Sequence, residues 1–357
     1  MRNKRVVIMS VMVLVVVLAI LFSGCAKQAV PATPTTPTTP TTPTKVYTLR
    51  CQSPYGPTSD STIMAFRVLD DLEKEFPNRL KIQRFYSCEL VKKGEILDAL
   101  GRGVLDFCVV QPCYYPGACP EGQWVWLPFL FDNLKETQEI WETTDVASII
   151  QDSYEKLGVM VFGGPFSIAY EVLYMTKVPP YHPSDVKGLK LRASGGIHST
   201  WTEKVLGVST VNVLAAEQYT ALQQGTIDGA IYPIYCLHEY KYYEVVKYVV
   251  VKPPIFLGNG YAAWSKKTFD KLPSDIQEAI KRISLKEARY CCSYEDEAYK
   301  KWVDILKKDG MTLIEWSDVD IDALRKASPP IWQEGYGAKN AKCARILDIC
   351  MKYKGMK

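Results

Sequence analysis

The chain has 357 residues and a net charge of +4, from 43 basic and 39 acidic side chains. Part of this small positive charge lies at the N-terminus, which argues against nucleic acid as a partner, because nucleic-acid binding needs a concentrated basic surface. About 313 residues follow Thr44, enough for two lobes that each bury a substantial core.

The first 25 residues have the pattern of an export signal: a basic start at Met1–Arg5, an apolar stretch at residues 6–22, and then Ser-Gly-Cys25. Cys25 also fits a lipoprotein box, although Phe22 stands where Leu is usual. The sequence therefore predicts a lipid anchor at Cys25. The alternative is an uncleaved signal anchor, because about 17 apolar residues nearly span a bilayer. In both cases the rest of the chain is expected outside the cytoplasm, tethered to the membrane.

Residues 26–44 form a linker that is dominated by a Pro-Thr repeat and contains no large apolar residue from position 31 onward. Such a composition favours an extended, semi-rigid chain. We expect a stalk that separates the membrane from a solute-binding body at residues 45–357.

The body alternates strand and helix patterns in chain order. Helices are expected at residues 59–76 and 93–101 and mostly between the later strands. From Pro273 the pattern becomes one long helical run, with Ser274 and Gln277 as a capping box at its start and Gly310 at its end. Strands are expected at residues 45–53, 80–86, 105–111, 159–163, 171–176, 189–192, 211–214 and 227–232. This order predicts an α/β fold with parallel sheets and a helical C-terminal third.

Two segments of the body share a pattern: residues 95–106 and 217–228 carry Glu, Ala-Leu, Gly and Asp at the same spacing. Each is expected to be a helix that ends at a left-handed Gly and leads directly into a strand. Chance similarity is one explanation, and two lobes of related architecture are the other, which we prefer. Ligands bind beyond the carboxyl ends of strands in such sheets. These ends lead to Gln111 and Tyr114 in one lobe and to Tyr232 in the other, which predicts a cleft between them.

One strand ends on a cation, Arg192, which is followed by Ala-Ser-Gly-Gly and then by a helical pattern from about His198. Small neighbours would let a ligand approach the guanidinium, whose planar fork fits a carboxylate. The start of a helix adds a positive dipole end. The alternative is that Arg192 pairs with a neighbouring Asp or Glu.

Catalytic and metal-binding motifs are absent from the sequence. Three histidines occur, none in a zinc-protease pattern, and there is no nucleophile elbow, phosphate loop or dinucleotide fingerprint. His198 is expected either to touch a ligand or to lie on the surface where its helix starts. No cofactor or metal is expected.

Ten cysteines follow Cys25, and none of them has the spacing of a metal site. Cys113 with Cys119, and Cys343 with Cys350, are plausible disulfides. Buried thiols are the alternative for the cysteines in apolar segments, which are Cys88, Cys108 and Cys236.

The run VKGLKLRASGG, continued by LGVSTVNVLAAEQYTALQQGTIDGAIYP, resembles the signature of the solute-binding proteins of TRAP transporters, the DctP type. Further matches are LKIQRFYSCELVKKGEILDALGRGVLDF, LPFLFDN and KLPSDIQEAI, so the resemblance covers residues 46–335. It implies two α/β lobes, linked by crossing strands and a long helix, that close on an organic acid. It also implies that the acid passes to a membrane permease driven by an ion gradient, and that the protein is not an enzyme.

The same resemblance implies roles for individual residues. Arg192 matches the arginine that grips the ligand carboxylate in this family, and Gln111 and Tyr114 match positions where the first-lobe loop meets the ligand. Members that bind sialic acid carry a second Arg and an Asn where this chain has Glu171-Val172 and Tyr232. Tyr232 would reshape the pocket. Glu171 would accept a hydrogen bond from a ligand hydroxyl or amine, or be an exposed strand residue.

These features favour a small or medium monocarboxylate, either hydroxylated or aromatic, as the ligand. Two other functional classes stay open from the sequence. One is a binding protein for an ATP-driven importer or a sensor, and the other is an exported enzyme.

Overall fold

The computed structural model describes residues 45–356, and of residues 167 and 168 it describes only the strand that contains them. The predicted export signal at residues 1–25, with Cys25, and the linker at 26–44 lie outside the described residues. Within residues 45–356, no helix is long and apolar enough to cross a membrane.

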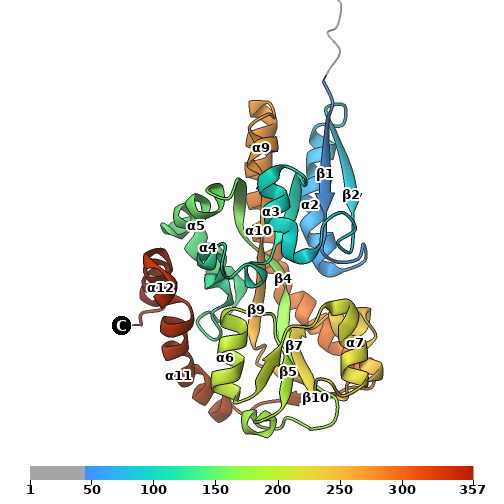
Figure 1. Cartoon of the computed structure of the whole chain (residues 1–357), viewed down its shortest axis with the longest axis vertical. Helices are drawn as coiled ribbons and strands as arrows, with labels where there is room; N and C mark the ends of the chain where they lie inside the picture. Colours follow the sequence, from blue (N-terminus) through green and yellow to red (C-terminus); the bar gives the residue numbers. More distant parts are fainter. Residues whose placement is uncertain (1–44, 357) are drawn as a thin grey trace, which may run out of the picture. The chain divides into compact units, whose positions relative to one another are not determined.

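The first lobe is built on three parallel strands, with β1 between β2 and β3. Helix α2 connects β1 to β2, and α3 leads into β3 (Figure 1). The apolar faces of β1 and α2 share a core with the start of the long helix α10 (Ser274–Lys308). The bounds are β1 Tyr47–Gln52, α2 Asp60–Glu75, β2 Leu80–Phe85, α3 Ile96–Arg102 and β3 Phe107–Val110.

The second lobe repeats this order, with β5 between β6 and β7 and all three strands parallel. Helix α6 connects β5 to β6, and α7 leads into β7. The bounds are β5 Lys190–Arg192, α6 Ile197–Leu206, β6 Ser209–Val211, α7 Ala215–Gln223 and β7 Gly229–Pro233.

The sequence repeat marks the same structural unit in both lobes. Gly103 and Gly225 follow α3 and α7 with left-handed φ angles of 73° and 69°, as expected from the shared pattern. The shared Asp has the same role in each unit. Asp106 Oδ2 accepts the backbone N–H of Arg50 at 2.7 Å, and Asp228 Oδ2 accepts that of Lys190 at 2.8 Å. The two segments are therefore equivalent parts of related lobes.

Two long strands, β4 (Val159–Met175) and β9 (Phe256–Ser265), run side by side between the lobes (Figure 1). The sequence predicted two separate strands, at residues 159–163 and 171–176, where β4 is continuous. The chain instead continues through a register shift, with Gly163 at a φ of +85°. A Cβ on Gly163 would lie 2.3 Å from the backbone oxygen of Ser284, so the glycine allows α10 to approach closely.

The sheet is mixed rather than parallel, which corrects the sequence-based expectation. β9 is antiparallel to β3, and β4 is antiparallel to β7. Three strands were not predicted at all: β8 (Tyr248–Lys252), β9 and β10 (Thr312–Glu315), of which β8 and β10 extend the second lobe beyond β4.

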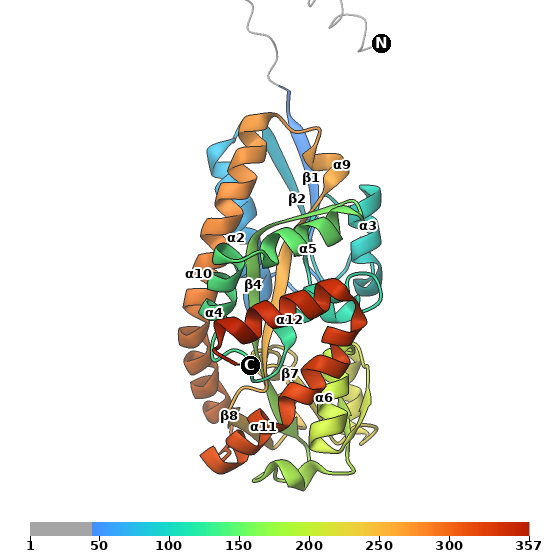
Figure 2. The same ribbon diagram turned by 90° about the vertical axis from the view of Figure 1, so that its left-hand side faces the viewer.

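Helix α10 (Ser274–Lys308) runs along both lobes (Figure 2). The predicted capping box is wrong, because the helix starts at Ser274 itself and Pro273 is the capping position. Gln277 instead donates to the backbone oxygens of Phe269 and Leu272, both at 2.9 Å.

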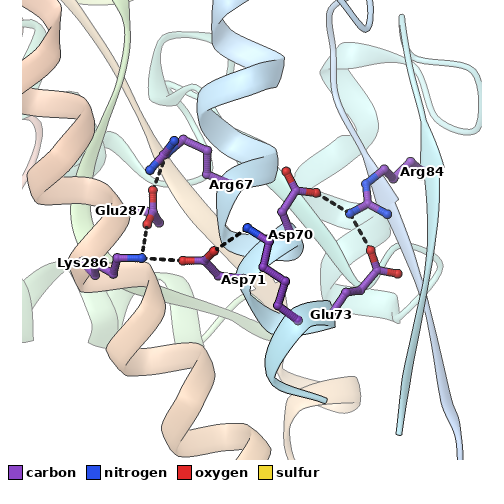
Figure 3. A network of polar contacts seen from close by, with 8 residues as sticks. Arg67, Asp70, Asp71, Glu73, Arg84, Lys286 and Glu287 are labelled. Carbon is purple, nitrogen blue, oxygen red and sulfur yellow. Dashed lines mark hydrogen bonds and ion pairs between the residues drawn. The ribbon is translucent and has the colours of Figure 1, made fainter. Parts of the chain in front are cut away.

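Helix α10 is joined to α2 by a network of ion pairs (Figure 3). Its buried Glu287 accepts a hydrogen bond from Arg67, and Lys286 contacts both Asp71 and Glu287, at 2.5 and 3.0 Å. These contacts fix the long helix on the first lobe.

The C-terminal helices α11 (Asp318–Gly335) and α12 (Ala341–Tyr353) complete the fold. α11 packs on α6 of the second lobe, where Trp201 Nε1 donates to Ser328 Oγ at 2.8 Å. α12 packs on η3 (Pro120–Trp126) and α5 (Val146–Glu155). The remaining elements are η1 Lys93–Glu95, η2 Pro112–Tyr114, η3 Pro120–Trp126, α4 Leu134–Thr143, α5 Val146–Glu155, η4 Pro183–Val186, α8 Cys236–Glu239, η5 Tyr242–Glu244, α9 Lys266–Phe269 and η6 Gly337–Lys339.

All ten cysteines of the described residues are thiols, so neither Cys113 with Cys119 nor Cys343 with Cys350 forms a disulfide. Cys108 and Cys236 are buried, as expected from their apolar segments, and Cys88 is half-buried.

Candidate functional site

Arg192 is the last residue of β5, and its side chain is buried at the junction of the lobes, with only 1% of the residue exposed. Its guanidinium donates to three neutral oxygens. Nε donates to the backbone oxygen of Val213 at 3.2 Å, and Nη1 donates to Ser194 Oγ at 2.8 Å. Nη2 reaches across to the first lobe and donates to the Tyr114 hydroxyl at 3.1 Å.

No ion pair joins Arg192 to an Asp or Glu within 4.0 Å among residues 45–356, so the alternative of a structural ion pair is wrong. Burial by itself would lower the pKa of Arg192. The nearby Tyr114, Tyr232 and Glu171 have the opposite and larger effect, so the pKa is raised above its ordinary value. The group is therefore a buried permanent cation without a directly bonded anion, an arrangement that costs free energy unless something compensates it.

The structure places two of the other predicted site residues, Tyr232 and Tyr114, in contact with Arg192. The ring of Tyr232, from β7, lies 4.1 Å from the Arg192 guanidinium carbon, and Tyr114 holds the same group from the first lobe. Burial, followed by the nearby Tyr55 and Tyr114, raises the pKa of Tyr232 well above its usual value. The Tyr232 hydroxyl is buried and has no hydrogen-bond partner among the described residues.

Gln111, the fourth predicted residue, joins this group through a tyrosine that the sequence analysis missed. Its Nε2 donates to the Tyr55 hydroxyl at 2.5 Å, and the Tyr55 ring meets Tyr235 of the second lobe edge-on, with 6.2 Å between centroids. Tyr55 follows the carboxyl end of β1, as Gln111 follows that of β3. Because ligands bind beyond the carboxyl ends of strands in such sheets, the sequence could have indicated Tyr55 as a site residue.

A second cation, Lys93 of η1, also faces the site. Its Nζ lies 4.2 Å from the Tyr114 ring centroid and donates to the Tyr55 hydroxyl at 3.2 Å. Lys93 was not predicted, and no local pattern distinguishes it from the neighbouring Lys92. Only the fold turns it toward Tyr114.

Glu171 and His198 form a buried pair, with Glu171 Oε2 2.7 Å from His198 Nε2. The residues are 1% and 0% exposed, so neither the exposed strand residue nor the surface histidine considered from the sequence is correct. The His198 ring stacks on Phe256 at 4.0 Å, and its Nδ1 lies 3.4 Å from the backbone nitrogen of Ser194. Burial lowers the pKa of His198.

The cavity beside Gln111 and Tyr55 has a volume of about 10 Å³ and is lined by Gln52, Ser53, Pro54, Tyr55, Ser61, Ala65, Val109 and Gln111. That volume holds about one water molecule. Residues 45–356 contain no cluster of three or more His, Cys, Asp or Glu side chains that could hold a metal ion.

Comparison with known proteins identifies the fold and the family. Residues 57–339 match the family described as bacterial extracellular solute-binding protein, family 7. The chain belongs to this family. A solute-binding protein of Verminephrobacter eiseniae is 27% identical over 250 residues, which are 69% of this chain and 72% of the relative.

Two solved structures have the same fold as this family 7 protein. A TRAP periplasmic solute-binding protein of Rhodoferax ferrireducens, with bound malonate, has a TM-score of 0.78 at 19% identity and covers 86% of this chain and 98% of its own. One from Sulfitobacter sp. NAS-14.1, with bound β-D-galacturonate, has a TM-score of 0.76 at 20% identity and covers 87% and 100%. The predicted two-lobed α/β fold and the predicted class, an extracellular solute-binding protein, are thereby confirmed.

Proposed function

We propose that this protein captures an organic acid by its carboxylate at Arg192 and delivers it to a TRAP permease without changing it chemically. The observation that supports this proposal is the buried guanidinium, which donates only to neutral oxygens. A carboxylate would supply the missing negative charge and accept the two parallel hydrogen bonds that a guanidinium fork offers.

Residues of both lobes would complete the site. In this proposal Tyr114 and Gln111 contact the acid from the first lobe, and Tyr232 stacks on its body from the second. The similar structures were solved with malonate and β-D-galacturonate, which both carry carboxylates. Both are TRAP solute-binding proteins, which favours a TRAP permease over an ATP-driven importer as the partner.

The first experiment identifies the bound compound. Mass spectrometry of the freshly purified protein should reveal an acid, which calorimetry then confirms as a ligand. The acid should be recovered unchanged after prolonged incubation with the protein. Turnover of the acid would instead favour an exported enzyme.

The second experiment tests the clamp. A hydrogen bond to a charged group contributes about 1.5–3 kcal/mol, and the unpaired ligand carboxylate adds a further penalty. Arg192→Ala should therefore weaken binding by at least ~10-fold, and we expect ~100-fold or more, with the fold intact. Arg192→Lys should restore binding only in part, since an ammonium lacks the fork. Arg325→Ala, at an exposed arginine of α11, is the control. Unchanged affinity in Arg192→Ala would refute the proposal.

The membrane attachment is a separate proposal, because Cys25 lies outside the described residues. We propose that Cys25 becomes the mature N-terminus and carries more than one acyl chain, since a single chain binds membranes only marginally. Cys25→Ser should release the protein from membranes. Recovery of intact Met1–Phe22 on the native protein would instead show an uncleaved signal anchor.

A further inference from the structure

Four buried residues form a path of polar contacts that ends at the Arg192 guanidinium and passes through the backbone and the hydroxyl of Ser194. Glu171 contacts His198 at 2.7 Å, His198 Nδ1 contacts the backbone N–H of Ser194 at 3.4 Å, and Ser194 Oγ accepts from Arg192 Nη1 at 2.8 Å. Each of these residues is at most 2% exposed. This path links an acidic residue of β4 to the cation of β5.

The hydrogen bonds determine the protonation state of His198. The backbone N–H of Ser194 can only donate, so Nδ1 accepts and carries no proton. The single proton then lies on Nε2 and is donated to Glu171, which accepts as a carboxylate. His198 is therefore neutral, in agreement with a pKa lowered by burial.

The charges around Arg192 can then be compared. Lys93 is the second cation that faces the site, and Glu171 is the acidic group that acts on Arg192. Burial raises the pKa of the surrounding Cys113, to about 12, and those of Tyr55, Tyr174 and Tyr232, so these four stay neutral. Among residues 45–356, these two cations and one carboxylate leave a single positive charge at the site, to be balanced by the ligand.

We propose that Glu171, held as a carboxylate by His198, restricts this site to acids that carry one negative charge. The inference rests on the proposed function, since it assumes that the acid binds at Arg192. A second carboxylate on the ligand would leave an excess negative charge in a buried site of low dielectric, next to Glu171. Family membership does not decide this point, because the similar structures hold both malonate, with two carboxylates, and galacturonate, with one.

The test replaces Glu171 by Gln, which keeps an acceptor for His198 and removes the charge. The probes are succinate, with two charges at pH 7.5, and succinamate, its monoamide, with one. D-galacturonate and its dicarboxylate, galactarate, form a second pair. The wild-type protein should bind the singly charged member of a pair at least ~10-fold more tightly. Glu171→Gln should reduce that ratio by ~10-fold or more. The substitution removes the repulsion between Glu171 and every carboxylate of the ligand, so the doubly charged acid gains more affinity than the singly charged one.

The control is Glu278→Gln, which makes the same change of net charge at an exposed position on α10. It should leave the ratio unchanged. An identical ratio in the wild-type protein and Glu171→Gln would overturn the inference. Arg192→Ala separates this failure from that of the proposed function. If Arg192→Ala weakens binding by ~10-fold or more, only the charge restriction is wrong. If the affinity is unchanged, the carboxylate clamp itself is wrong.

A second measurement needs no ligand. The chain has three histidines, and His182 and His238 are exposed. Nitrogen NMR of histidine-labelled protein should therefore show one non-titrating ring, with its proton on Nε2 and a bare Nδ1, between pH 5 and 8. A His198 that is doubly protonated at pH 7 would add a positive charge to the site and would overturn the inference without any binding data.

Discussion

At the scale of single residues, the centre of the site is the buried positive charge of Arg192, which does not by itself stabilise the folded protein. Arg192 is fully buried and bonded to a hydroxyl from each lobe and one backbone oxygen. A buried ionic group often stabilises a protein less than an apolar side chain of similar volume would. The residue is therefore best explained by binding rather than by stability.

This explanation predicts that Arg192→Met loses acid binding but not stability. Methionine fills a similar volume and removes a buried charge, which favours the folded state. The Val213 backbone oxygen, Ser194 Oγ and the Tyr114 hydroxyl each lose a donor, which disfavours it, so these two effects should nearly cancel. The free energy of unfolding without ligand should change by no more than about 1 kcal/mol. Denaturant titration measures this, and Trp201→Ala in the core should lose about 3–5 kcal/mol in the same assay. A loss of that size in Arg192→Met would show that the arginine is structural.

At the scale of elements, the repeated helix–Gly–strand unit explains why each lobe presents residues at a strand end. The left-handed Gly stops the helix, and the following Asp fixes the neighbouring parallel strand by its backbone N–H. In one lobe the strand then leads to Gln111 and Tyr114, and in the other to Tyr232.

Because the units are equivalent, Gly103→Ala and Gly225→Ala should cost similar stability. Each would force a side chain into the left-handed region, at about 1 kcal/mol or slightly more. Thermal unfolding of both variants checks this. Gly117→Ala, where a Cβ meets nothing within 4 Å and φ is not positive, is the matched control and should be neutral. A cost confined to one of the two repeat glycines would argue against their equivalence.

A second element-scale prediction concerns the end of α8, where Glu239 of the second lobe lies beside Asp60 at the start of α2. Burial, followed by the charge of Asp60, raises the pKa of Glu239 to about 7. The folded protein therefore binds more protons here than the unfolded chain between pH ~4.5 and ~7. Stability should fall as the pH rises through this range and stay lower above it.

Glu239→Gln should remove this effect. Because the group is partly exposed, we expect a gain of about 1–2 kcal/mol at pH 8 after allowance for solvent screening, and no gain at pH 4.5. Denaturant titrations at the two pH values measure the difference. An equal effect of the substitution at both would show that Glu239 does not titrate abnormally.

At the scale of the whole described body, the lobes meet at the site itself. Arg192 contacts Tyr114, and Tyr235 of the second lobe contacts Ser61 of the first at 2.9 Å. Only 1% of Arg192 is exposed in this arrangement, so an organic acid can reach its guanidinium only if the lobes separate. The continuous strands β4 and β9 are the connections about which such a movement would occur.

We therefore expect the acid to shift the protein toward the compact arrangement. The radius of gyration from small-angle scattering should be smaller with the acid identified by mass spectrometry than without it. Arg192→Ala should show no such decrease at the same acid concentration. Equal radii with and without acid in the wild-type protein would mean that binding does not draw the lobes together.

The sequence by itself determined the features that depend on neighbouring residues. The helix–Gly–strand units, the cation at the end of β5 and the residues at the ends of β3 and β7 are local patterns, because capping and strand alternation act over a few positions. The family signature followed from the same segments and was confirmed.

Tertiary structure decided what depends on contacts between distant segments. Glu171 and His198 are 27 positions apart, and no spacing rule joins them. Lys93 resembles its neighbour Lys92 until η1 turns it toward Tyr114. β4 continues through Gly163 because α10, more than 100 residues later in the chain, packs against that glycine. The sequence thus identified the clamp, whereas the charges that surround it were set by packing, since electrostatic balance in a buried site depends on which groups the fold brings together.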